Sequence, residues 1–94
     1  MKTITFSSSF KRAYKSLLRK RPDLKPQIDA ILIILATTPF EPTLQTHKLK
    51  GKLAGSWACS VEYDCRIVFD SVDNPETGAE EILLIDIGSH DEVY

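Results

Sequence analysis

The sequence lacks several features that define other classes of protein. It has only two cysteines, Cys59 and Cys65, without Cys-x-x-Cys spacing or a neighbouring histidine, so we expect buried free thiols and neither a zinc nor a redox site. No apolar run approaches the roughly 20 residues that span a bilayer. The N-terminus lacks the apolar segment of a signal peptide. These absences predict a cytoplasmic protein that does not bind membranes.

The composition is that of one packed domain. The chain has 94 residues, of which 43% are hydrophobic and 27% charged, which excludes disordered and collagen-like chains. Two separate cores would each be too short for burial to offset the loss of chain entropy. We therefore expect residues 1–94 to form a single domain.

Opposite charges are concentrated in the two halves of the chain. Residues 1–52 hold eleven basic and three acidic residues, a formal charge of +8, whereas residues 53–94 hold Arg66 and ten acids, a charge of −9. A basic surface on so small a domain is typical of proteins that bind a phosphate backbone. The alternative is a solvated helix surface, since a pI of 6.1 argues against strong unspecific binding of nucleic acid.

The first part of the chain predicts a short strand and two helices. Residues 2–6 alternate polar and apolar side chains, and the serines at 7–9 can cap a helix. Pro22 ends this helix, and we expect Asp23 to cap a second one, which ends before Pro39. The first helix is basic and has one apolar stripe, formed by Phe10, Tyr14, Leu17 and Leu18.

The second part predicts three strands after a loop. Residues 39–55 read as an exposed basic loop, residues 57–62 and 64–71 as paired strands, and residues 82–87 as an apolar central strand after a turn. The order β-α-α-β-β-β predicts an α+β fold. Its mostly antiparallel four-stranded sheet carries the helical hairpin on one face.

The two histidines, His47 and His90, are candidates for proton transfer because both lie beyond the ends of predicted elements, where side chains reach solvent. A surface or hydrogen-bonded structural role is the alternative for each. Neither histidine has a carboxylate or cysteine at ligand spacing, so we expect no metal site.

Asp64 and Arg66 are a second candidate pair. They are two residues apart on one predicted strand, which places them on the same side of the sheet. A salt bridge is one interpretation; the other is a guanidinium that binds a phosphate through its two parallel donors. Tyr94, the last residue, is either a frayed end or an aromatic ring on which a base stacks.

Three segments carry a resemblance to a known family: residues 47–57 with Gly-Ser-Trp at their end, residues 63–69, and residues 85–94 with Gly-x-His-x-x-x-Tyr. Over nearly the whole chain they resemble the RelE/ParE superfamily of type II toxin–antitoxin toxins, above all its RelE/YafQ-like branch. Such toxins cut messenger RNA in the ribosomal A site without a metal and are neutralised by an antitoxin. The resemblance implies a RelE-like fold and a cytoplasmic endoribonuclease without a cofactor. It implies an antitoxin, the ribosome and messenger RNA as partners.

The resemblance also implies roles for individual residues. His90 corresponds to the C-terminal catalytic histidine of YafQ-like toxins, and His47 to the histidine before the Gly-Ser-Trp turn. Asp64 corresponds to the acid that opens the next strand, and Arg66 to the arginine of the run that follows. Tyr94 stands where relatives keep an aromatic residue near the chain end.

The sequence departs from the family pattern at four positions. Ser60 and Asp86 stand where relatives have a histidine and an arginine, and Trp57 and Cys59 where RelE has lysines. Fewer groups are therefore available to neutralise the phosphate.

The implied reaction is attack of the ribose 2′-hydroxyl on the adjacent phosphorus, with loss of the 5′-oxygen. We expect His90 to act as general acid or base, with His47 or Asp64 as its partner, and Arg66 to stabilise the phosphorane. We expect Tyr94 and Trp57 to stack on a base of the RNA. We expect the phosphates to be contacted by a basic set of five lysines, Lys11, Lys15, Lys48, Lys50 and Lys52.

Two alternatives share this fold. One is a ParE-like toxin that blocks DNA gyrase without chemistry, and the other is an inert relative that only binds an antitoxin. The presence of His47, Asp64, Arg66 and His90 together argues against a gyrase inhibitor, which does not need them. Under any of these interpretations, the groove of the helical hairpin and an exposed strand edge can accept an antitoxin segment.

Overall fold

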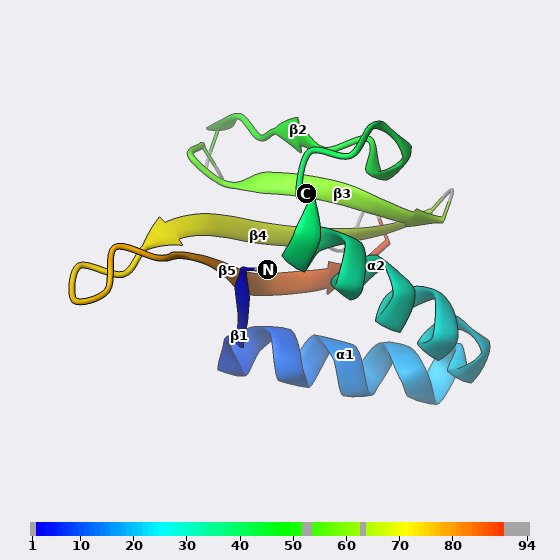
Figure 1. Cartoon of the computed structure of the whole chain (residues 1–94). Helices are drawn as coiled ribbons and strands as arrows, with labels where there is room; N and C mark the ends of the chain where they lie inside the picture. The colour runs from blue at the N-terminus through cyan, green and yellow to red at the C-terminus, as the bar shows by residue number, and fades with distance from the viewer. Residues whose placement is uncertain (1, 52–53, 63, 90–94) are drawn as a thin grey trace.

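The computed structural model describes residues 2–51, 54–62 and 64–89. One sheet of five strands has the order β1-β5-β4-β3-β2, and two helices cover one of its faces (Figure 1). The strands are β1 (Thr3–Phe6), β2 (His47–Lys48), β3 (Trp57–Glu62), β4 (Cys65–Asp73) and β5 (Glu80–Gly88). The helices are α1 (Ser8–Lys20) and α2 (Lys25–Thr37), with single 3-10 turns at η1 (Pro22–Leu24) and η2 (Pro42–Leu44).

This architecture confirms the predicted α+β class and the helical hairpin on one face. The pairings of β2 with β3, β3 with β4 and β4 with β5 are antiparallel, and β1 pairs with β5 in parallel. The predicted count of four strands was wrong by one, because the segment interpreted as a basic loop contains β2. This strand has only two residues, too few for an alternating pattern to show in the sequence.

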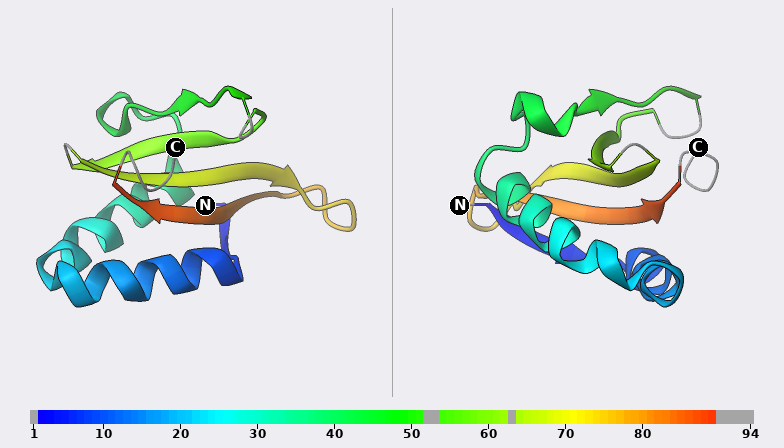
Figure 2. Two further views of the ribbon diagram at one scale, coloured as in Figure 1. Left: turned by 180° about the vertical axis from the view of Figure 1, so that it is seen from behind. Right: turned by 90° about the vertical axis from the view of Figure 1, so that its right-hand side faces the viewer.

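The hydrophobic core lies between the helices and one face of the sheet. Ile67 and Phe69 on β4 and Leu84 on β5 are fully buried there, against Phe10 of α1 and Leu35 of α2. Helix α2 crosses in front of the sheet in Figure 1 and behind it in the left view of Figure 2. The two helices therefore do not cover the opposite face of the sheet.

One predicted helix cap is confirmed and another is wrong. Ser7 caps α1, because its Oγ accepts a hydrogen bond from the Phe10 amide at 3.0 Å. Asp23 does not cap α2, whose N-cap residue is Leu24. The Asp23 carboxylate instead accepts two hydrogen bonds from the Arg21 guanidinium, at 3.2 and 3.0 Å. These bonds lower the pKa of Asp23.

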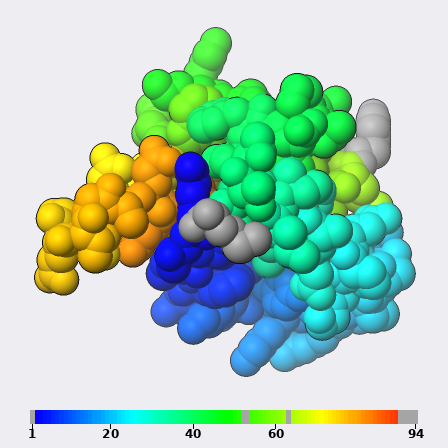
Figure 3. All heavy atoms as spheres, viewed as in Figure 1, coloured from blue at the N-terminus to red at the C-terminus, as the bar shows by residue number. Residues whose placement is uncertain are grey.

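The loop between β4 and β5 projects from the body of the molecule (Figure 3). It is closed by backbone hydrogen bonds between Asn74 and Ala79 and between Gly78 and Asn74. Gly78 has a φ of 73°, which suits glycine, and no atom lies within 4 Å of the position that a Cβ would take.

None of the described helices is long and apolar enough to cross a membrane.

Both cysteines are buried free thiols, as predicted. Burial raises the pKa of Cys59 to about 12 and that of Cys65 to about 11, from an ordinary value of 9.0. A thiolate is poorly solvated at either position. Neither thiol is set up to act as a nucleophile near neutral pH.

We expect the free energy of unfolding to fall as pH rises above 9. The unfolded chain then releases thiol protons that the native chain retains, and each thiol lowers stability by up to about 1.4 kcal/mol per pH unit until its native pKa is reached. Urea titrations at a series of alkaline pH values measure this slope. Cys59→Ala should reduce it; a slope equal to that of the parent protein would show that Cys59 is not buried as described.

Candidate functional site

The candidate site lies on the face of the sheet opposite the helices. Along β4, Arg66 stands between Cys65 and Ile67, whose side chains face the core. The Arg66 side chain therefore points to the other face. Residues paired across neighbouring strands point to the same face. Arg66 pairs with Ser60 on β3 and with Gly88 on β5.

His47 lies on the same face, in the row of cross-strand pairs next to the row that contains Arg66. It pairs with Ala58 on β3, which pairs with Val68 on β4. His47 and Arg66 lie two strands apart, about 10 Å across the sheet and about 7 Å along it. The structure therefore brings the predicted histidine and arginine to one face of the sheet, in adjacent rows of cross-strand pairs.

The loop before β2 holds the His47 ring in place. Its Nδ1 lies 3.0 Å from the backbone oxygen of Gln45. Gln45 also accepts a hydrogen bond from the Ser60 hydroxyl at its side-chain Oε1, at 3.3 Å. Gln45 thus contacts the rows of both His47 and Arg66.

The turn between β3 and β4 positions Arg66. Its half-buried guanidinium donates hydrogen bonds from Nη1 to the backbone oxygens of Glu62, at 3.0 Å, and Cys65, at 3.4 Å. The Glu62 carboxylate forms an ion pair with Arg21 at 3.2 Å, which ties this turn to the helical hairpin. The carboxylates of Asp23 and Glu62 raise the pKa of Arg21.

A cavity of about 560 Å³ opens beside Arg66. Strand β2 pairs only with Ala58 and Trp57, so among the described strands none pairs with the edge of β3 at this point. The walls come from η2, α2, β3 and β4, through Ile31, Thr43, Gln45, Ser60, Val61, Glu62 and Arg66. The cavity has the polar and apolar surfaces that a nucleoside requires.

Other predicted residues are placed differently or lie outside the described part. Asp64 lies in the turn before β4, which begins at Cys65, so the argument that alternation puts it beside Arg66 was wrong. Lys52, His90 and Tyr94 lie outside the described residues. The described chain ends at Ser89, directly after the Gly88 that pairs with Arg66.

Trp57 points away from His47 and Arg66. It packs against the core on the helix side, where its ring meets Phe40 edge-on at 4.8 Å. The Lys48 ammonium lies 5.6 Å from the centre of the same ring. These contacts give Trp57 a structural environment separate from the candidate site.

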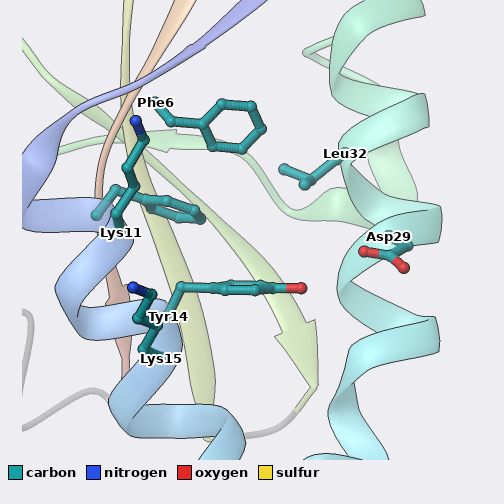
Figure 4. Close-up of a pocket in the computed structure, with 7 residues that line it drawn as sticks. Phe6, Lys11, Tyr14, Lys15, Asp29 and Leu32 are labelled. Carbon is teal, nitrogen blue, oxygen red and sulfur yellow. The ribbon is translucent and has the colours of Figure 1, made fainter.

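Lys11 and Lys15 border a second surface, an apolar groove between α1 and α2 (Figure 4). The groove has a volume of about 340 Å³. The rings of Phe6 and Tyr14 point from β1 and α1 toward Leu32 of α2. The predicted basic set is therefore divided between this groove and the segment around β2, where Lys48 and Lys50 lie.

Sequence reasoning missed Gln45 as part of the site. Gln45 is part of the site because the loop places it beside His47 and Ser60. Glutamine belongs to no sequence motif that indicates RNA cleavage. Among the described residues, no group of three or more histidine, cysteine, aspartate or glutamate side chains is placed to hold a metal ion.

The architecture, a mixed sheet with a helical hairpin on one face, is that of RelE-like toxins. A family model described as the bacterial toxin of the type II toxin–antitoxin system, YafQ, matches residues 2–94. The chain belongs to this YafQ toxin family. No curated protein matches the sequence significantly.

Solved structures of such toxins have the same fold. A metal-bound toxin from Helicobacter pylori is 29% identical, with all of both chains covered and a TM-score of 0.77. YafQ from E. coli is 19% identical over 100% of this chain and 99% of its own, with a TM-score of 0.80. YafQ in the E. coli DinJ–YafQ toxin–antitoxin complex is 20% identical over 99% and 97% of the two chains, with a TM-score of 0.78.

We expect Phe40→Ala to shift the fluorescence emission of Trp57, the only tryptophan in the chain, to longer wavelength. The substitution removes the ring that shields the indole and costs about 1 kcal/mol of aromatic contact in addition to lost burial. Emission spectra and thermal unfolding measure both effects. Phe6→Ala, in the other groove, is the matched control and should leave the emission unchanged; an unchanged spectrum in Phe40→Ala would contradict the packing described for Trp57.

Proposed function

We propose that this toxin is a ribosome-dependent endoribonuclease that cleaves messenger RNA and thereby inhibits translation. The observation that carries the proposal is the placement of His47 and Arg66 on one face of the sheet, where Arg66 lines a cavity of about 560 Å³. This arrangement occurs in a chain that matches the YafQ toxin family over residues 2–94.

The proposed step needs a base, an acid and a cation. The ribose 2′-hydroxyl gives its proton to the base and forms a bond to the adjacent phosphorus, and the bond from phosphorus to the 5′-oxygen breaks. The acid protonates the leaving 5′-oxygen, so that the products are a 2′,3′-cyclic phosphate and a 5′-hydroxyl. We assign the proton transfers to His90 with His47 or Asp64.

Arg66 stabilises the phosphorane in this proposal. A guanidinium offers parallel donors to two phosphate oxygens, and a half-buried position strengthens the attraction by reducing the screening by water. The carbonyls of Glu62 and Cys65 hold the group before RNA arrives. Preorganised charge of this kind lowers the barrier without rearrangement during the reaction.

RNA is held by stacking and by phosphate contacts. Because Trp57 packs on the helix side, we assign the stacking of a base to Tyr94. Lys50 and Lys52 follow His47 in the chain and are proposed to contact the message. Lys48, which lies beside the Trp57 ring on the helix side, is proposed to contact ribosomal RNA. Lys11 and Lys15 are proposed to contact ribosomal RNA from the helical hairpin.

A cognate antitoxin is the proposed protein partner. The groove between α1 and α2 has an apolar floor that includes Phe6 and Leu32, with Lys11 and Lys15 beside it. This combination fits an acidic amphipathic segment. Such a segment would also cover the two lysines assigned to the ribosome, so binding at this groove and action on the ribosome would exclude each other.

We expect Arg66→Ala to lower the rate of messenger RNA cleavage by about 10²- to 10³-fold, because one preorganised donor group to the transition state is lost. Expression in bacteria should then no longer arrest growth. Primer extension on messages from a purified translation system measures the cleavage. Circular dichroism checks the fold, since Arg66 also binds two backbone carbonyls.

Arg19→Ala is the matched control, because Arg19 is an exposed arginine of α1. It should retain cleavage and toxicity. A folded Arg66→Ala protein with parental cleavage would contradict the assignment of Arg66. Growth arrest with intact messages and a DNA-damage response would instead favour gyrase as the target.

Binding to ribosomes should weaken steeply with salt. Each phosphate that a lysine neutralises contributes about −0.7 to −0.9 to the slope of log K against log salt. Co-sedimentation with ribosomes between low and high salt measures this slope. Combined Lys48→Ala and Lys50→Ala should reduce it by about 1 to 2 units; binding that is independent of salt would contradict the assignment of the basic residues.

A further inference from the structure

Gln45 has a backbone conformation that is unfavourable for glutamine. Its φ is 53°, and among the described residues it is the one non-glycine with a positive φ. Glycine adopts this left-handed region without steric cost, whereas a residue with a Cβ does not. A glutamine at such a position, next to a candidate catalytic residue, suggests a role for the residue itself.

Contacts on both sides of Gln45 hold it in this conformation. Its own amide donates to the Pro42 carbonyl at 3.1 Å, and the preceding Leu44 side chain is fully buried in the core. The following Thr46 donates its hydroxyl hydrogen to the Pro39 carbonyl at 2.7 Å. The direction of the Gln45 carbonyl is therefore set by the turn.

This carbonyl determines which nitrogen of His47 carries the proton. The Gln45 oxygen can only accept a hydrogen bond, and His47 Nδ1 lies 3.0 Å from it, so Nδ1 must be the donor. In the neutral imidazole, Nε2 then has the lone pair. This bond stabilises the Nδ1–H tautomer relative to the Nε2–H tautomer, which histidine in water favours.

The side chain of Gln45 connects the same turn to the row of Arg66. Ser60 donates its hydroxyl hydrogen to Gln45 Oε1 at 3.3 Å, and Ser60 is the cross-strand partner of Arg66. Gln45, Ser60 and Arg66 also line one cavity. A displacement of Gln45 would therefore change the position of His47 relative to Arg66.

We propose that Gln45 is a positioning residue of the ribonuclease site: its left-handed backbone holds His47 as the Nδ1–H tautomer, so that His47 exchanges protons with RNA through Nε2. This inference rests on the proposed ribonuclease function. It identifies the reacting atom of His47, whether His47 acts as acid or as base, because Nδ1 keeps its proton in both states.

Nitrogen-15 NMR of His47 in the wild-type protein tests the tautomer directly, at a pH where the ring is neutral. The expected result is a protonated Nδ1. Gln45→Val should convert the signal toward a mixture, because a β-branched residue disfavours a positive φ. We expect its kcat for RNA cleavage to fall at least about tenfold, with KM within about twofold, because His47 is misplaced and RNA binding is not.

Two further variants separate positioning from stability. Gln45→Gly accepts the same φ and retains the carbonyl, so it should restore the tautomer and bring kcat to within about threefold of wild type. Gly78→Val puts the same strain in the remote loop, at a φ of 73°. It should cost stability and leave the tautomer and kcat unchanged. If Gln45→Val does not fold, Gln45→Ala takes its place.

A wild-type His47 protonated at Nε2 would overturn the role of Gln45, as would Gln45→Val or Gln45→Ala with an unchanged tautomer and kcat. A wild-type chain that does not cleave RNA would overturn the proposed function, even if Nδ1 carries the proton. The two failures are therefore distinguishable.

Discussion

The burial of alternate residues along β4 is the constraint on which the candidate site depends. Cys65, Ile67 and Phe69 are anchored in the core against the helices, which forces Arg66 to the opposite face of the same strand. The pairing with β3 and β5 then places Ser60 and Gly88 beside it. A shift of one residue in this register would bury the guanidinium and expose the core, so the core and the candidate site specify the same register.

The two faces of the molecule serve different purposes in this account. In the proposed function, the sheet face presents His47 and Arg66 to RNA; the helical hairpin has an apolar groove with Lys11 and Lys15 at its edge. The Arg21–Glu62 ion pair connects the hairpin to the turn that holds Arg66. The lysines assigned to both surfaces come from the basic first half of the chain, and Arg66 is the one basic residue of the acidic half, in a chain whose net charge is only −1.

Much of the fold could be predicted from periodicity, and the candidate site only in part. Strand β3 was predicted with its observed bounds, because residues 57–62 form a run rich in strand-forming residues. Strand β2 has two residues and was missed, and Asp64 proved to lie in a turn. Gln45 was not predictable, because its role depends on a positive φ set by tertiary contacts of its neighbours.

The central claim is that RNA binds to the sheet face that carries His47 and Arg66. The most direct measurement is a backbone NMR titration with a short RNA in which the attacking 2′-hydroxyl is replaced, so that it cannot be cleaved. We expect the amide signals of Gln45, Ser60, Arg66 and Gly88 to shift first, while those of Phe10 and Leu32 stay in place. Shifts confined to the groove between α1 and α2 would contradict the central claim.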